Sequence, residues 1–453
     1  DNLNQSRRYS YADLIPKHRG YDVVYRLWNY GSTCLFAWGD PDYARRFSES
    51  IKMGGTGYTV DAPLSLKGGC EGRLDADFEV YADPVLRGDD FEDERYWFRY
   101  LVYGRLGYHP DTDARTWRRE LESRFGAEAA PTMECAYTAA SRVLPLITAF
   151  HMPVHPSLQY WPEISTGGAL FAANNHNPAF KDTTYGSALP SEQGLFYGID
   201  RFVDDALDGR LDGKYTPIAV SRWLEAYATT LGDALTALED IPGLPDKREY
   251  ARTRLDFAML ACLARYHAEK ILAAVELALY ERSSHPEHLG TSRDHMAKAE
   301  AFWKELARLG ERYHRNLMFA AGSGFERSGH WNDRTRETEQ DLVTLESLIA
   351  SAPMDTGETR IDLPDTEPEF DSTAIRVDWP GRTEAGRPPA VRVTVANDPA
   401  IDRVVLQYRH TNQAEGPFQT VMMERQDDGF QAEIPAEYVV SRWDLLAYLT
   451  VFD

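Results

Sequence analysis

The pattern of apolar and polar positions near the amino end predicts a strand, a helix and a second strand. Residues 23–28 and 57–61 are mainly apolar, and residues 41–53 place aromatic and aliphatic side chains at helical spacing. Asp40 is a suitable N-cap for this helix, and Gly54 begins the glycine pair that ends it. A strand–helix–strand crossover joins parallel strands, and parallel sheets require cover on both faces. We therefore predict the C-terminal strand–helix units of a (β/α)8 barrel.

Beyond this unit the periodicity changes twice along the chain. Helical repeats dominate to about residue 350, and the segment 250–280 is apolar on most of its circumference, which is typical of a central bundle helix. After Pro353, a linker rich in Pro, Asp, Glu and Thr leads into stretches that alternate apolar and polar residues, as antiparallel strands do. Helices are expected at 95–106, 112–126, 132–150, 198–208, 217–240, 246–283, 291–320 and 335–350, and strands at 390–395, 404–409, 418–421, 430–434 and 446–451.

These patterns predict a multidomain α+β chain. Its domains are the C-terminal part of a (β/α)8 barrel (1–110), a large all-α helical domain (111–352) and a C-terminal antiparallel β-sandwich (353–453). The chain begins at Asp1 rather than at a methionine, so we expect a fragment whose earlier barrel strands lie upstream. Catalytic groups of such barrels sit at the carboxyl ends of several strands, so part of the site is expected upstream as well.

The amino-acid composition argues against several classes of binding partner. Lys and Arg number 49 against 71 Asp and Glu, and the net charge of −22 repels phosphate backbones, so we expect no nucleic acid. Apolar runs stay short of the roughly 20 residues that a membrane span needs, so we expect no membrane partner. The four cysteines are too widely spaced to indicate a zinc site or a disulfide framework, and we expect no metal and no cofactor. The aromatic content of 12% suits surfaces that stack on sugars, although large cores explain it as well.

Polar and aromatic residues directly follow the two predicted barrel strands. Trp28 and Asn29 end the first strand and Asp61 ends the second, which are positions that face substrate in barrel enzymes. Asp61 is the candidate catalytic carboxylate, as a general base, a nucleophile or a ligand to a sugar hydroxyl; a polar cap on the following loop is the structural alternative. That long loop contains Lys67 and Arg73, which could meet a carboxylated substrate.

A second group of candidates lies in an irregular segment, 150–185, inside the helical region. Imidazole, amide, carboxylate and aromatic groups gather there, a mixture that suits the orientation of a bound sugar. The candidate substrate-binding residues are His155, Trp161, Glu163, Asn174, Asn175, His176 and Tyr185. A metal site of His151, His155 and Glu163 is the less favoured interpretation, since Pro153 breaks the helix that would direct both rings to one ion. Packing of the segment over the barrel mouth is the structural alternative.

Two segments resemble a known family. Residues 96–108 (YWFRYLVYGRLGY), continued by 117–121 and 124–126, resemble a segment of α-glucuronidase-like glycoside hydrolases of polysaccharide-degrading bacteria. Residues 408–415 (YRHTNQAE) look like part of the sandwich domain found with them. The resemblance implies a (β/α)8 barrel joined to a helical domain and a β-sandwich, with acid and base carboxylates on barrel strands. The matching segments are architectural, so no catalytic residue is transferred from the family.

The leading hypothesis is a glycoside hydrolase that acts on polysaccharide-derived glycans through two carboxylates and an oxocarbenium-like transition state. Uronic-acid-containing glycans are one candidate substrate. The alternative from another class is a non-catalytic glycan-binding or scaffold protein. A lyase, with a Tyr or His base and Lys181 beside a uronate, is rated lower. A secreted or periplasmic location is favoured over a cytoplasmic one, and the oligomeric state stays open.

Overall fold

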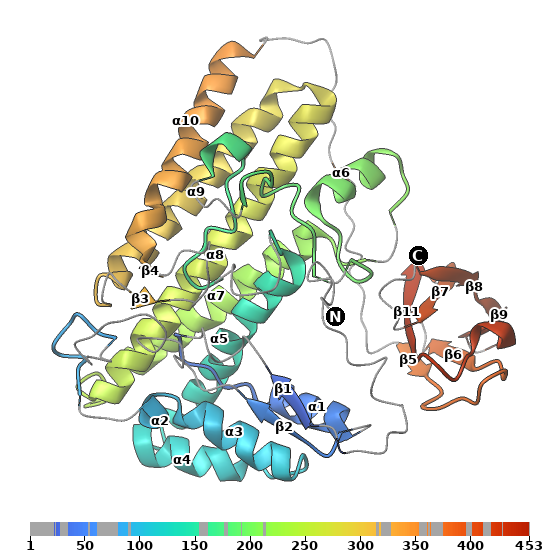
Figure 1. The fold of residues 1–453 in the computed structure, drawn as a ribbon, viewed down its shortest axis with the longest axis horizontal. Helices are drawn as coiled ribbons and strands as arrows, with labels where there is room; N and C mark the ends of the chain where they lie inside the picture. Colours follow the sequence, from blue (N-terminus) through green and yellow to red (C-terminus); the bar gives the residue numbers. More distant parts are fainter. Residues whose placement is uncertain are drawn as a thin grey trace.

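Figure 1 shows a computed structural model of the protein, in which a body of long helices is joined to a small parallel sheet and to antiparallel sheets near the carboxyl end. The structure describes residues 22, 24–27, 35–52, 55–60, 80–88, 92–153, 162–175, 180–191, 193–211, 214–313, 317–318, 328–352, 360, 363, 375–395, 401–410, 418–427 and 429–452. Within these ranges no helix is both long and apolar enough to cross a membrane.

The small sheet is the predicted crossover unit. Its strands are β1 (Val24–Leu27) and β2 (Gly57–Val60), which pair in parallel, and α1 (Pro41–Lys52) connects them. The strand–helix–strand prediction is therefore confirmed, including the direction of the strands. Among the described residues these two strands form a sheet by themselves, and the closed barrel stays a prediction.

The start of α1 is fixed by the predicted cap. Asp40 Oδ1 accepts hydrogen bonds from the backbone N–H groups of Asp42 at 3.0 Å and Tyr43 at 3.3 Å. Its other oxygen, Oδ2, accepts from Arg142 Nε of the helical body at 2.8 Å. One buried carboxylate thus satisfies the helix terminus and ties the crossover unit to the helices.

Aromatic rings fill the space between the sheet and the helices that follow it. After β2 come α2 (Glu92–Arg95) and α3 (Trp97–Tyr108), and α3 packs beside α1. The rings of Phe47 and Tyr58 meet edge to face, with centroids 5.0 Å apart. The Tyr58 hydroxyl donates to the backbone carbonyl of Tyr103 at 2.9 Å, which fixes β2 to α3.

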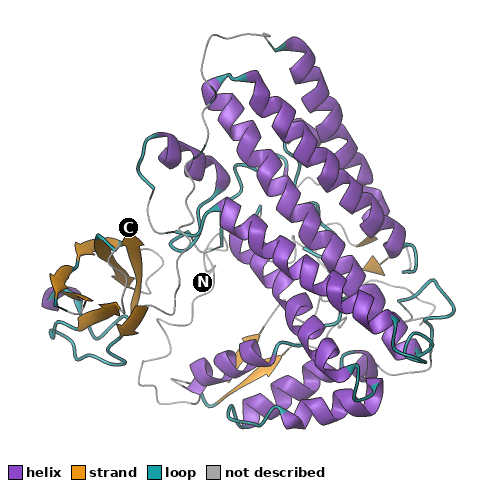
Figure 2. Ribbon diagram, turned by 180° about the vertical axis from the view of Figure 1, so that it is seen from behind, coloured by secondary structure: helices purple, strands orange, loops and turns teal. Residues whose placement is uncertain are grey.

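The helical body is built around one long central helix. It consists of α4 (Arg115–Phe125), α5 (Ala130–Phe150), α6 (Ile199–Leu207), α7 (Pro217–Glu239), α8 (Arg248–Ser283), α9 (Pro286–Gly310) and α10 (Thr335–Ser351). Figures 1 and 2 show α8 between α7 and α9. Most of its side chains are buried, as its apolar pattern predicts, and a half-buried stripe along it includes Arg265, Glu269 and Glu276.

The helix predicted over 291–320 has different ends in the structure. It starts at Pro286, because proline suits the first helical turn, where its missing N–H needs no partner. It ends at Gly310, where the ring of Trp331 packs against the backbone. The residues described beyond it up to position 329 are not helical: β3 (Leu317–Met318) pairs antiparallel with β4 (Ser328–Gly329).

The carboxyl-terminal residues form two antiparallel sheets that we call the β unit. One sheet has the order β5 (Ile375–Asp378), β6 (Ala390–Val395), β10 (Gly429–Glu433), β9 (Glu424–Gln426), and the other has the order β11 (Leu445–Phe452), β7 (Arg403–His410), β8 (Gln419–Met422). All five predicted strands are present. The predictions missed β5 and β9, which are short strands at sheet edges.

Hydrophobic contacts group the described residues into two cores. One cluster runs from Leu35 to Leu345 and joins the crossover unit to the helical body. A second cluster lies within the β unit and includes Val393, Leu406 and Phe430. The domain boundary expected near residue 110 stays a prediction, since apolar packing is continuous across it.

Candidate functional site

The structure describes four of the predicted site residues: Glu163, Asn174, Asn175 and Tyr185. The others lie outside the described residues: Trp28, Asn29, Asp61, Lys67, Arg73, His155, Trp161 and His176. The candidate site is therefore built from the residues that flank these positions, at the carboxyl ends of β1 and β2.

Glu163 holds the backbone that follows β1. Its Oε2 accepts from the N–H of Leu35 at 2.8 Å, and its Oε1 accepts from the N–H of Phe36 at 3.0 Å. The backbone carbonyl of Glu163 accepts from Trp331 Nε1 at 2.8 Å. The side chain is almost fully buried, so these backbone donors compensate for the water that its charge has lost. Glu163 thus brings the chain after β1 against the segment 150–185, the two regions in which site residues were predicted.

Asp256 of α8 makes the next contact along the same backbone. Its Oδ2 accepts from the N–H of Ala37 at 2.8 Å and from Arg95 Nη2 at 3.0 Å. Arg95 also donates to the carbonyl of Leu35 at 2.9 Å, and the Tyr313 hydroxyl donates to Asp256 Oδ1. Burial raises the pKa of Asp256, and the neighbouring Arg95 guanidinium opposes this change.

The sequence analysis missed both Asp256 and Arg95. A signal was present for Asp256, because it lies next to apolar residues in the segment 250–280, and a carboxylate that is buried there has to be paired. Arg95 lay at the start of a predicted helix, and nothing in its local sequence indicated a partner in α8. The two residues are separated by 161 positions in the chain.

The remaining described candidates bind other parts of the protein. Asn174 Nδ2 donates to Asp341 Oδ1 of α10 at 2.9 Å, and Asn175 Oδ1 accepts from the N–H of Ala169 at 2.7 Å. The Tyr185 hydroxyl and His267 Nδ1 of α8 are 2.8 Å apart, and Tyr185 is fully buried. These side chains fold the segment onto α8 and α10, whereas Glu163 binds the backbone of Leu35 and Phe36.

A buried lysine anchors the same segment. Lys270 Nζ of α8 donates to the carbonyl of Gly168 at 2.7 Å and to the Tyr266 hydroxyl at 2.8 Å, and lies 3.9 Å from Asp341 Oδ2. Burial lowers the pKa of Lys270 and raises the pKa of Asp341, while their mutual attraction opposes both changes. This charged cluster supports the packing interpretation for the described part of the segment.

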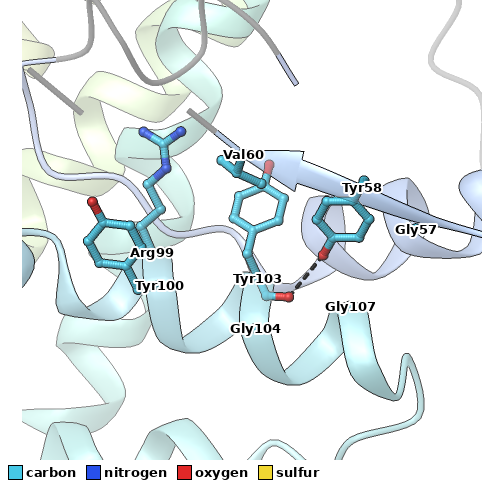
Figure 3. Close-up of a pocket in the computed structure, with 8 residues that line it drawn as sticks. All are labelled: Gly57, Tyr58, Val60, Arg99, Tyr100, Tyr103, Gly104 and Gly107. Atoms are coloured by element: carbon cyan, nitrogen blue, oxygen red, sulfur yellow. Dashed lines mark hydrogen bonds between the residues drawn. The ribbon is translucent and has the colours of Figure 1, made fainter. Parts of the chain in front are cut away.

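An open pocket of about 420 Å³ lies between β2 and α3 (Figure 3). It is lined by Gly57, Tyr58, Val60, Arg99, Tyr100, Tyr103, Gly104 and Gly107. Figure 3 shows Arg99 at the end of the pocket nearest the tip of β2. Burial raises the pKa of Tyr58, so its hydroxyl stays a hydrogen-bond donor at neutral pH. Within the described ranges, no three His, Cys, Asp or Glu side chains are grouped as a metal site.

Comparisons with known proteins identify a solved structure with a similar fold. No known protein family matches the chain by sequence, and no curated protein matches it either. The solved structure of a GH138 enzyme targeting pectin rhamnogalacturonan II has a similar fold, with a TM-score of 0.59 and 14% sequence identity. The match covers 73% of this chain and 48% of that chain. This chain therefore spans about half the length of that enzyme, and the likeness concerns the fold.

Proposed function

We propose that the protein acts as a glycoside hydrolase on polysaccharide-derived glycans, with uronic-acid-containing pectic oligosaccharides as the first substrates to test. The observation that carries this proposal is the fold likeness to a glycoside hydrolase over 73% of the chain. The parallel β1–α1–β2 unit supports it, because barrel enzymes place their reactive groups at the carboxyl ends of such strands.

The proposed mechanism needs two carboxyl groups in complementary roles. One protonates the leaving oxygen while the other acts as nucleophile or activates water, through an oxocarbenium-like transition state. Asp40, Glu163 and Asp256 are not assigned to these roles, because each accepts hydrogen bonds from backbone N–H groups. Asp61 stays the candidate for one role, and the second carboxyl group is assigned to a barrel strand outside the described residues.

A second candidate function is glycan binding without cleavage. Two observations favour this function. The carboxylates of Asp40, Glu163 and Asp256 bind backbone N–H groups, and a pocket lined by tyrosines lies beside β2. Such a protein would retain oligosaccharides and release no product from them.

The test of the catalytic role is the substitution Asp61→Asn in the protein produced from its complete gene. We expect turnover of a pectic oligosaccharide to fall by about 10²–10⁴-fold, because a reacting carboxylate is lost, while binding of the sugar persists. Asp111→Asn, at an exposed aspartate, is the matched control and should keep full turnover. Unchanged turnover in D61N removes Asp61 from the mechanism.

A further inference from the structure

Three aromatic side chains form an exposed cluster that we call the aromatic platform. Phe196 precedes α6, Tyr215 follows it, and Trp223 lies on α7. The ring centroids of Phe196 and Tyr215 are 5.4 Å apart, and those of Tyr215 and Trp223 are 5.0 Å apart. Tyr215 is 49% exposed and Trp223 is 36% exposed, so these rings are grouped without being buried. Single exposed apolar side chains are ordinary, whereas grouped ones mark binding surfaces.

Backbone contacts fix the arrangement of the platform. The N–H of Tyr215 donates to the carbonyl of Leu195 at 2.8 Å, and the N–H of Tyr197 donates to the carbonyl of Tyr215 at 3.0 Å. The next residue, Thr216, is the N-cap of α7 and so sets the start of the helix that carries Trp223. The rings therefore keep their mutual geometry through the backbone that carries them, which reduces the entropy that a ligand has to overcome.

The geometry and the polar edges of the two exposed rings suit a sugar. The planes of Tyr215 and Trp223 meet at 74°, so their faces form two walls of a corner. In the described part of the chain, the Tyr215 hydroxyl and the Trp223 indole nitrogen have no hydrogen-bond partner. A pyranose ring presents C–H groups that pack on one aromatic face and hydroxyls that can bond to these two polar groups.

The size of the platform separates a sugar from a protein partner. An aromatic side chain has an area of about 150–250 Å², so Tyr215 and Trp223 each expose about 100 Å². A stable protein interface needs about 800 Å² from each partner. The platform is much smaller than that and matches one or two sugar rings. Its side chains are uncharged, so binding there needs no carboxylate on the sugar.

We propose that the aromatic platform is a second glycan-binding site, which stacks pyranose rings of a long pectic chain away from the ends of β1 and β2. Figures 1 and 2 show α6, which Phe196 and Tyr215 flank, well above the small sheet in both views. The platform rests on the proposed function, because it holds a part of the polysaccharide that does not react. It raises the local concentration of the chain at the protein.

Affinity electrophoresis in gels that contain soluble pectin tests this site, with the protein produced from its complete gene. The variants are Trp223→Ala, Tyr215→Ala and the matched control Trp379→Ala. Trp379 follows β5 and is 45% exposed, and no described ring packs against it. We expect W223A and Y215A to weaken pectin binding about 10-fold, as the loss of an aromatic anchor does, and W379A to leave it unchanged. Thermal unfolding reports that each variant is folded.

Equal binding by the wild type and both platform variants, or no binding by the wild type, overturns the proposal. An equal loss in W379A overturns it too, since any exposed tryptophan would then contribute. Stacking on uncharged rings persists at high ionic strength, so wild-type binding that disappears there contradicts it. A dimer that W223A abolishes assigns the platform to a second copy of the chain and also overturns the proposal.

The two platform variants lie on different elements, so either one decides the outcome if the other does not fold. Turnover of a pectic disaccharide by the wild type tests the proposed function separately. Weaker pectin binding by W223A and Y215A with no turnover supports the platform and refutes hydrolysis. Turnover with equal pectin binding by all variants supports hydrolysis and refutes the platform.

Discussion

At the scale of single residues, buried carboxylates position distant segments of this protein by accepting hydrogen bonds from backbone N–H groups. Glu163 and Asp256 together accept the N–H groups of Leu35, Phe36 and Ala37, which follow β1 in the chain. A buried charge is tolerated when such donors and a countercharge replace its water. The backbone of Leu35, Phe36 and Ala37, which leads into α1, is thereby held against α8 and the segment 150–185.

The ion pair of Arg95 and Asp256 should be important for stability. We expect Arg95→Leu to lower the free energy of unfolding by about 3–5 kcal/mol, because it leaves the Asp256 carboxylate buried without its countercharge. Urea denaturation measures this loss. Arg115→Leu, which removes an exposed pair with Asp113, is the control and should leave stability nearly unchanged. Equal effects of the two substitutions would contradict the assignment of Arg95 to a buried pair.

His151 should make stability depend on pH. Its Nε2 lies 2.7 Å from the carbonyl of Gly167, and burial lowers its pKa from 6.5 to about 4. The unfolded chain therefore binds more protons between these values, and stability falls as the pH is lowered through this window. From pH 7 to pH 5 the loss is about 2 kcal/mol from this residue.

The variant His151→Gln isolates this contribution, because glutamine keeps a donor toward Gly167 and does not titrate. We expect the loss of stability between pH 7 and pH 5, measured by urea denaturation, to be smaller in H151Q than in the wild type. The difference between the two proteins in how their free energy of unfolding changes with pH excludes the contributions of Lys270, Glu337 and Asp341, because both proteins share them. Parallel slopes would show that His151 titrates normally in the folded protein.

Residue roles were the hardest feature to predict from the sequence. Glu163 was predicted to bind substrate, and in the structure it binds the backbone of two residues 127 and 128 positions away; local patterns contain no information on such pairings. Tyr185 was expected to contact a sugar, yet it packs in the core against His151. Polar side chains in an irregular segment can serve packing or binding, and composition alone does not separate the two.

At the scale of elements, periodicity predicted the long helices and the central strands well. The 36-residue α8 was predicted because apolar residues occupy most of its circumference, and capping residues such as Asp40 placed helix starts. Short elements were missed: β9 has three residues, all exposed, so no alternation of buried and exposed side chains marked it. The β3–β4 pair was missed for a similar reason, since each strand has two residues.

The pairing of β10 with β6 should depend on one glycine. A Cβ atom at Gly429 would lie 1.8 Å from the carbonyl oxygen of Val393, so Gly429→Ala forces the two strands apart. We expect a cost of about 2 kcal/mol and a melting temperature of the β unit lower by roughly 10 °C. Because the β unit has its own hydrophobic cluster, the helical body should keep its transition.

Calorimetry of the chain measures both transitions. Gly381→Ala is the matched control, since a Cβ atom there has nothing within 4 Å, and it should leave the melting of the β unit unchanged. A shift of the helical transition in G429A would mean that the β unit and the helical body unfold as one.

At the scale of the whole molecule, one continuous core joins the crossover unit to the helices. Asp256 of α8 binds the backbone of Ala37, which precedes α1, and the side chain of Arg95 in α2, so both segments are tied to the helical body. The sequence predicted the order of helical and β regions but not this junction, which is formed by residues that are 161 and 219 positions apart in the chain.

The most direct measurement of the central proposal is the release of new reducing ends from rhamnogalacturonan II oligosaccharides by the protein produced from its complete gene. We predict that products accumulate in proportion to enzyme and time, and that Asp61→Asn slows their formation about 10²–10⁴-fold while oligosaccharide binding persists. Retention of the same oligosaccharides with no product from these or other polysaccharide fragments would contradict hydrolysis and leave glycan binding as the function.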